Sequence, residues 1–89
     1  MEETISGANR ILNERVRQIN KEGYSYEHDD EHIDGEIAMA AAAYTIPEPK
    51  FWPWRDSEWK PSGDRIKDLT KAGALIAAEI DRLLRKQNG

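Results

Sequence analysis

Two histidines stand among carboxylates in the stretch 27–36, which carries six acidic residues. In a continuous helix, His28, His32 and Glu36 would share one face at i, i+4 and i+8, a spacing that presents two imidazoles and a carboxylate to a zinc or iron ion. Gly35 and the dense negative charge oppose such a helix. We therefore expect a turn in which the histidines form local hydrogen bonds, with no metal and no other cofactor.

Aromatic residues and prolines dominate the stretch 45–63. It contains all four prolines and all three tryptophans, Trp52, Trp54 and Trp59. An indole face beside a cation such as Lys60 can stack on a base while the charge neutralises a phosphate, as in nucleotide-binding proteins. The alternative is that the indole rings cover the core of a small protein that cannot otherwise close it. Both interpretations stay open, because different tryptophans can have different roles.

Basic residues form a third candidate at the start of the last predicted helix, where Arg65, Lys67 and Lys71 occur. A helix N-terminus carries unpaired N–H groups and a partial positive charge, so an anion would be stabilised there. The sequence lacks the glycine-rich loop of phosphate-binding motifs. Ordinary solvated charge is therefore the alternative.

Three helices are predicted to position these residues. Apolar residues recur every three or four positions over about 4–21, and Gly23 ends that helix. Alanines favour a second helix at about 34–44, and the most regular spacing predicts a third at about 64–86. The expected fold is all-α: a single three-helix domain formed by the whole chain, with 45–63 as a long ordered loop between helices two and three.

Two apolar stripes follow from this spacing. The stripe of the first helix consists of Ile5, Ala8, Leu12, Val16 and Ile19. The stripe of the last helix has the alternating three- and four-residue spacing of a coiled coil and consists of Ile66, Leu69, Gly73, Ile76, Ile80 and Leu83. Such a stripe offers an assembly surface, and a chain this short is too small to form a deep pocket alone. We therefore expect a homo-oligomer.

The composition excludes several classes of function. Without cysteine, the chain has no disulfide, no thiolate metal site and no thiol catalysis. The net charge of −4 argues against bulk binding to nucleic acid or to anionic lipid. No apolar run approaches the ~20 residues that span a bilayer, so we expect a cytoplasmic protein without a membrane partner.

Several short motifs occur together along the chain. They are Glu22-Gly23-Tyr24, Glu27-His28-Asp29-Asp30 with His32, Gly35-Glu36-Ile37, Trp52-Pro53-Trp54, Trp59-Lys60-Pro61, Lys71-Ala72 and Ala74-Leu75-Ile76. As a set, they resemble a family of small, mostly uncharacterised phage and prophage proteins, in which Trp commonly stands at the position of Tyr24. The resemblance implies a phage setting in the cytoplasm of the host bacterium. By analogy with other small phage proteins, it implies a counter-defence role.

The combined expectation is a small phage accessory protein that binds and sequesters a nucleotide-like ligand, such as a host immune signal, without turning it over. Aromatic rings would enclose the base, cations would contact the phosphates, and the histidine turn would contact the sugar or the edges of the base. The predicted ligand-binding residues are Trp52, Trp54, Trp59, Tyr24, His28, Asp30, His32, Arg15, Arg17, Lys60, Arg65 and Lys71.

Two other functions stay open. A Mg²⁺-dependent pyrophosphatase of the MazG type would use Glu14, Glu36 and Glu79, and the similarity is to the architecture of that class, not to its motif. An inhibitor of a host DNA-binding enzyme would present the acidic stretch 27–36 in place of phosphates.

Overall fold

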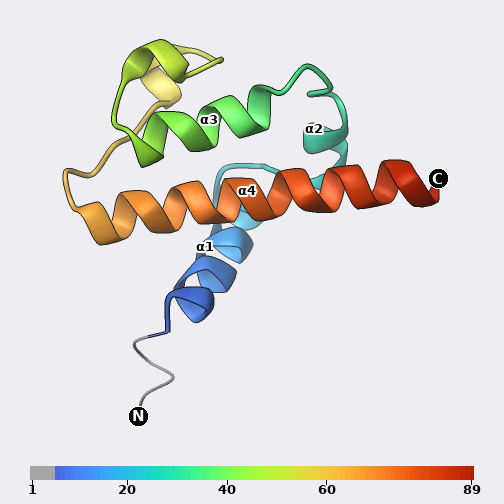
Figure 1. Ribbon diagram of the computed structural model, residues 1–89, viewed down its shortest axis with the longest axis horizontal. Coiled ribbons are helices and arrows are strands. Elements are labelled where there is room, and N and C mark those ends of the chain that lie inside the picture. Colours follow the sequence, from blue (N-terminus) through green and yellow to red (C-terminus); the bar gives the residue numbers. More distant parts are fainter. Residues whose placement is uncertain (1–5) are drawn as a thin grey trace.

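The protein is all-α in the computed structural model, which describes residues 6–89 (Figure 1). The four helices are α1 (Gly7–Lys21), α2 (Tyr26–Asp30), α3 (Glu36–Thr45) and α4 (Arg65–Asn88), and two short 3-10 helices, Pro49–Phe51 and Asp56–Glu58, lie between α3 and α4. Residues 6–89 contain no strand, so the predicted all-α class is confirmed. Thr4 and Ile5, where the first predicted helix and its stripe begin, lie outside the described residues.

The helix count differs from the prediction of three. The additional helix, α2, is five residues long and has no apolar period that would reveal it. It begins because the Ser25 side chain accepts a hydrogen bond from the backbone N–H of His28 at 3.2 Å, the usual N-cap interaction. The turn after α2 ends at Gly35, whose φ of 84° lies in the left-handed region that favours glycine.

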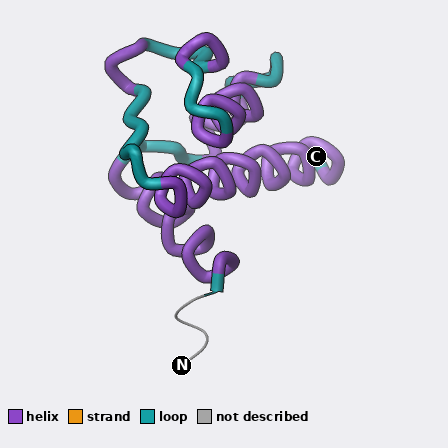
Figure 2. The backbone as a smooth tube through the Cα atoms, turned by 60° about the vertical axis from the view of Figure 1, so that its left-hand side comes forward, coloured by secondary structure: helices purple, strands orange, loops and turns teal. Residues whose placement is uncertain are grey.

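The long helix α4 is the central helix of the fold, and α1 and α3 both pack on it. In Figure 1, α3 runs alongside α4 in the opposite direction, and α1 crosses α4 steeply on the other side. Figure 2 shows the same arrangement after rotation, with helices as the only regular elements among residues 6–89. None of the helices in this part of the chain combines the length and apolar composition that crossing a membrane requires.

Small side chains fill most of the core between α3 and α4. The buried hydrophobic residues of this core are Ile37, Ala40, Ala41, Ala43, Tyr44, Trp52, Ala72, Leu75 and Ala78. Alanine lets two helix backbones approach closely, and Tyr44 and Trp52 cover one end. Among the described residues, only Ile37 and Leu75 are large aliphatic side chains that are fully buried, so the core is compact but narrow.

The crossing of α1 over α4 depends on Gly73. A Cβ atom at this position would lie 2.5 Å from Cδ1 of Ile11, closer than any ordinary contact. The missing side chain at Gly73 therefore makes room for Ile11, and this contact helps to set the crossing point.

The predicted apolar stripes do not face the core. On α1 the buried residues are Arg15 and Gln18, whereas the stripe residue Leu12 is 60% exposed. On α4 the core takes Ala72 and Leu75, and the stripe lies on an outward face. Helical spacing correctly identifies a stripe, but most of its large side chains are about half exposed, and the stripe of α4 meets α1 at Gly73.

The stretch between α3 and α4 is attached to the helices by hydrogen bonds. Nε1 of Trp52 donates to the carbonyl of Arg55 at 2.8 Å, and the backbone N–H of Lys60 donates to the hydroxyl of Tyr44 at 2.9 Å. Nζ of Lys71 in α4 donates to the carbonyl of Lys60. These contacts hold the stretch against the ends of α3 and α4.

Candidate functional site

Four rings from distant parts of the sequence form an aromatic cluster: Tyr24, His28, His32 and Trp54. The rings of Tyr24 and His28 are stacked, with centroids 4.8 Å apart and planes inclined by 15°. Trp54 contacts both histidines, with centroids 5.7 Å from His28 and 5.0 Å from His32. The structure therefore brings the histidine turn and the tryptophan stretch together on one side of the molecule.

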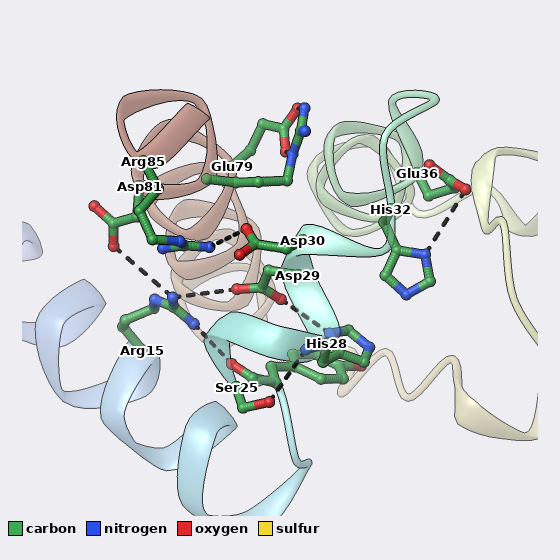
Figure 3. A network of polar contacts seen from close by, with 12 residues as sticks. Arg15, Ser25, His28, Asp29, Asp30, His32, Glu36, Glu79, Asp81 and Arg85 are labelled. Atoms are coloured by element: carbon green, nitrogen blue, oxygen red, sulfur yellow. Dashed lines mark hydrogen bonds and ion pairs between the residues drawn. The ribbon is translucent and has the colours of Figure 1, made fainter. Parts of the chain in front are cut away.

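A buried ion pair supports this cluster from beneath (Figure 3). Nη2 of Arg15 lies 3.3 Å from Oδ2 of Asp29, and its Nη1 donates to the carbonyl of Tyr24. The other oxygen of Asp29 lies 2.9 Å from Nδ1 of His28, so the carboxylate favours a proton on Nδ1 and orients the imidazole. Arg15 is 7% exposed, and its guanidinium is engaged with Asp29 and the Tyr24 carbonyl, so it does not line the surface at which a phosphate contact was predicted.

The outer part of the same network ties α2 to α4. Asp30 pairs with Arg85 at 2.7 Å, and this hydrogen bond raises the pKa of Arg85. The Arg85 guanidinium also lies over the ring of Tyr26, 4.3 Å from its centroid. Asp30, a predicted contact for the ligand sugar, is thus a surface carboxylate that already has a cationic partner.

The zinc or iron site considered above required His28, His32 and Glu36 on one continuous helix. α2 ends at Asp30 and α3 begins at Glu36, so His28, His32 and Glu36 do not share one helix. Nδ1 of His32 lies 3.7 Å from the Glu36 carboxylate (Figure 3). Within residues 6–89, no three His, Asp or Glu side chains are placed to hold one metal ion.

A basic groove of about 590 Å³ lies between α1 and the start of α4. It is lined by Arg10, Asn13, Glu14, Arg17, Ser62, Ile66, Lys67, Thr70 and Lys71. Four of these residues are cationic and one is anionic, although the chain as a whole has a net charge of −4. The concave surface formed by two helices and a loop therefore carries a local excess of positive charge.

One cation of the basic groove, Arg17, is held in a fixed position by its neighbours. Its Nε and Nη2 donate to the two oxygens of Glu14, each at 2.8 Å, and its Nη1 lies 3.4 Å from Glu22. The hydrogen bond to Glu14 raises the pKa of Arg17, so this side chain stays charged. Burial alone would raise the pKa of Glu14, but the hydrogen bond and charge of Arg17 hold it below its usual value.

The other three cations of the basic groove have no carboxylate partner among residues 6–89. Arg10 and Lys67 form no ion pair within residues 6–89, and both are exposed. Lys71 likewise forms no ion pair with a described carboxylate: its ammonium donates to the Lys60 carbonyl and lies 5.4 Å from the ring centroid of Tyr44. An anion in the groove would therefore meet cations whose charge is not already neutralised.

A small polar cavity of about 20 Å³ continues from the basic groove toward the aromatic cluster. Its lining consists of Glu14, Arg17, Gln18, Glu22, Tyr24, Tyr44, Glu58, Lys60, Lys71 and Leu75. The space is about that of one water molecule. Tyr24 belongs to both the cavity and the aromatic cluster, and burial raises the pKa of its hydroxyl. The cavity thus connects the two parts of the candidate site.

Gln18 brings an unpartnered acceptor to the polar cavity. This residue is 3% exposed, and its Nε2 donates to Glu14 at 3.2 Å and to the carbonyl of Lys71 at 3.4 Å. Its Oε1 is buried and has no hydrogen-bond partner among residues 6–89. A buried acceptor of this kind is satisfied by a water molecule or by an N–H group of a ligand.

The three tryptophans have different surroundings. Trp52 is buried and packs edge-on against Tyr44, with ring centroids 5.6 Å apart, so it belongs to the core and does not enclose a ligand base. Trp54 and Trp59 are half-buried, and the Nε1 atom of each is buried without a partner. Of the two, only Trp54 belongs to the aromatic cluster.

Two predicted phosphate contacts lie outside the basic groove. Arg65 donates to the carbonyl of Thr45 at 2.9 Å and thus links the start of α4 to the end of α3. Lys60 lines the polar cavity, and its ammonium lies 3.4 Å from Glu22. Of the predicted phosphate contacts, Arg17 and Lys71 therefore line the basic groove and Lys60 lies in the adjoining polar cavity. Arg65 lies outside both.

The carboxylates of the pyrophosphatase alternative are dispersed. Glu14 pairs with Arg17 on α1, and Glu79 pairs with Arg82 on α4 at 2.8 Å. Glu36 accepts a hydrogen bond from the backbone N–H of Asp34 at the start of α3. Each carboxylate has a different partner in a different place, so the Mg²⁺ site that this alternative requires is not formed.

The inhibitor alternative is also weakened by the structure. Asp29 is buried and Asp30 is paired with Arg85, so two of the six carboxylates in 27–36 present no free charge. A surface that imitates DNA needs an array of exposed negative charges. The acidic stretch is better described as a polar support for the aromatic cluster.

Two residues of the candidate site, Arg10 and Gln18, were not among the predicted ligand-binding residues. Arg10, Glu14 and Arg17 recur at i, i+4 and i+7, which places them on one face of α1. This spacing was the available signal for the groove, together with the i, i+4 pair Lys67 and Lys71. No sequence signal indicated Gln18, because its role depends on the carbonyl of Lys71, 53 residues away.

Comparisons with known proteins add no relative. No family model matches the chain, and neither the curated proteins nor the solved structures contain a significant match.

Proposed function

We propose that this protein binds a nucleotide-like ligand and that the basic groove holds its phosphates. The observation that carries this proposal is the local charge: four cations and one carboxylate line the groove in a chain with a net charge of −4. Arg10 and Lys67 form no ion pair within the part of the chain that the structure describes, so they can form charge-assisted hydrogen bonds with phosphate oxygens, which are about twice as strong as neutral ones.

The polar cavity supports the nucleotide-like character of the ligand. It opens beside Arg17 and Lys71, so a group that extends from a bound phosphate reaches Gln18 and Tyr24. The unpartnered Oε1 of Gln18 needs a donor, and the space fits one small group. An amino group of a base is a donor and is small enough for this space. A bound water molecule has the same two properties, and the amino group can displace it.

Binding without turnover is part of the same proposal. A catalytic base needs a pKa near the working pH. The single carboxylate of the basic groove is Glu14, and Arg17 holds its pKa below the usual value, so it is a weak base. The two histidines belong to the aromatic cluster and do not line the groove.

The biological setting is proposed on the motif resemblance alone. We propose a phage or prophage protein that acts in the cytoplasm of its host and sequesters a nucleotide signal of bacterial defence. We also propose that the stretch 45–63 is an ordered loop without ligand and that the chain self-associates. Ligand binding at the basic groove does not depend on these points, because all its residues come from one chain.

Thermal unfolding with a panel of cyclic dinucleotides, cyclic ADP-ribose isomers and linear nucleotides tests the proposal. A ligand at a hundred times its Kd stabilises the native state by about 2.7 kcal/mol, which raises Tm by several degrees in a protein of this size. We expect such a shift with at least one member and recovery of that compound unchanged. The absence of any shift at millimolar ligand, or recovery of a hydrolysed product, contradicts the proposal.

Charge-neutralising variants locate the site. Lys67→Gln removes one groove cation and should weaken binding by about tenfold, the effect of one charged hydrogen bond. The matched control is Lys86→Gln, because Lys86 is exposed on the same helix about 28 Å away. Equal losses in the two variants would show a nonspecific charge effect and contradict the groove as the site.

A further inference from the structure

The protein keeps its small apolar residues inside and most of its large ones outside. Ile37 and Leu75 are the only large aliphatic side chains among residues 6–89 that are fully buried. The exposed large hydrophobic residues are Leu12, Val16, Tyr26, Ile33, Met39, Ile46, Ile66, Leu69, Ile76, Ile80, Leu83 and Leu84. Scattered exposed residues need no explanation, but residues that form one continuous surface do.

Six of these exposed residues come from α4, and five of them follow a heptad pattern. Leu69, Ile76 and Leu83 are seven residues apart, and Ile66, Gly73 and Ile80 occupy the alternate stripe positions. Of these, Gly73 packs against Ile11 of α1, and the other two are exposed. Their exposed fractions are all near one half, with 52% for Ile80. No charged residue occurs within the stripe from Ile66 to Leu83, so this face of α4 has the pattern of a coiled-coil seam.

An apolar groove of about 410 Å³ widens the seam on the side of α3. It is lined by Ala38, Ala41, Ala42, Thr45, Ile46, Ile76, Glu79 and Ile80. The one charged residue, Glu79, pairs with Arg82 at 2.8 Å through two hydrogen bonds. The alanines of α3 form a shallow floor, and Ile76 and Ile80 form the wall that α4 contributes.

We propose that this apolar face binds α4 of a second copy of this chain. A heptad seam is self-complementary, because the side chains at alternate positions on one helix fit the holes between the same positions on another. The positions beside the seam include Thr70 and Ala77, whose small side chains allow two helices to approach closely. The same chain therefore supplies both the protruding side chains and the spaces that accept them.

The area of the face agrees with a stable dimer. Ile46, Ile66, Leu69, Ile76, Ile80, Leu83 and Leu84 are each about half exposed. Together they offer on the order of 500 Å² of apolar surface, and the smaller stable interfaces bury ~600 Å² on each partner. When the polar residues around the face are included, an interface between two copies reaches this area. Such an interface also removes from water the large apolar residues that the narrow core does not bury.

The mass of the protein in solution tests this inference. We expect light scattering during size-exclusion chromatography at about 100 µM to give at least twice the 10.2 kDa of one chain. Ile80→Glu places a charge in the centre of the face and should raise the dissociation constant by about a hundredfold or more, which gives a single chain at the same concentration. Circular dichroism checks that the variant keeps its helices.

Ile33→Glu is the matched control. Ile33 is 67% exposed in the turn before α3 and lies off the apolar face, so this variant should keep the mass of the wild type. A wild-type mass of one chain overturns the proposal and leaves a helix of another protein as the occupant of the face. A wild-type assembly that Ile80→Glu does not dissociate also overturns it, because the copies then meet elsewhere.

Discussion

Buried polar side chains determine the local structure at the candidate site. Arg15, Gln18 and Asp29 lie inside the protein within a layer that alanines otherwise fill. Each is positioned by a partner from another element, such as Asp29 of α2 for Arg15 of α1. The cost of burying these charges is offset only when every group finds its partner, which makes the site sensitive to single substitutions.

Loss of Arg15 should destabilise the protein strongly. In Arg15→Met the carboxylate of Asp29 stays buried without its guanidinium, and we expect a loss of about 3–5 kcal/mol in the free energy of unfolding. Urea unfolding measures this loss. Arg10→Met, on the exposed face of the same helix, should change stability by no more than about 0.5 kcal/mol. The interpretation is wrong if the two variants are equally stable.

Asp68 should give the stability a dependence on pH in the acid range. Burial alone would raise the pKa of Asp68, but the backbone N–H and hydroxyl of Ser62, each 2.8 Å away, hold it below its usual value of 3.8. A lowered pKa in the folded state adds stability that is fully present above 3.8 and is lost as the pH falls through the folded value.

The expected result for Asp68→Asn is a loss of about 1 kcal/mol at neutral pH that disappears at the acid end of the titration. Chemical unfolding at several pH values between neutral and strongly acidic conditions measures it. Asp56→Asn, at an exposed carboxylate, should show no such trend. A constant difference between Asp68→Asn and wild type at every pH would contradict the role assigned to the ionised carboxylate.

At the scale of elements, helix positions could be predicted and helix orientations could not. The spacing of apolar residues and the alanine content predicted the bounds of α1, α3 and α4 to within a few residues. The five-residue α2 was missed because it depends on the Ser25 cap and on tertiary contacts of Asp29. The surroundings of the stripe containing Leu12 could not be predicted, since periodicity shows that a helix has an apolar side but does not show what covers it.

The hydroxyl of Tyr44 should hold the stretch before α4 in place. It accepts the hydrogen bond from the backbone N–H of Lys60, and Tyr44→Phe removes that acceptor. We expect the Lys60 amide to exchange with solvent about fivefold to tenfold faster, and the Ala72 amide in α4 to keep its rate. Hydrogen exchange followed by NMR measures both amides.

Tyr26→Phe is the control for this prediction, because Tyr26 is exposed and its hydroxyl forms no hydrogen bond within the described residues. Unchanged exchange at Lys60 in Tyr44→Phe would mean that other contacts of the stretch are sufficient to hold it.

At the scale of the whole molecule, two surfaces of different chemistry share the helix α4. Its first two turns line the basic groove with α1, and its outward stripe forms the apolar face beside α3. The sequence showed the charges and the stripe separately. Their separation onto different sides could not be predicted, because it depends on how steeply α1 crosses α4 at Gly73.

The tryptophan-containing stretch 45–63 and the histidine-containing stretch 27–36 also show that relative positions in the fold are only partly predictable from sequence. Their approach could be expected from composition, and Tyr24, His28, His32 and Trp54 do meet. The groove that best fits an anion is separate from this cluster, and it adds Arg10 and Asn13 of α1, which were not predicted, to Arg17 and Lys71, which were. Long-range pairing of this kind depends on packing and is not encoded in any local pattern.

An NMR titration tests the central claim, that the basic groove is the ligand site. Amide shifts of the isotopically labelled protein are followed during addition of each nucleotide of the panel. We predict shifts concentrated at Arg10, Arg17, Lys67 and Lys71, with Lys86 unchanged. Shifts confined to the apolar face around Ile76 and Ile80, or no shifts with any nucleotide, would contradict the account.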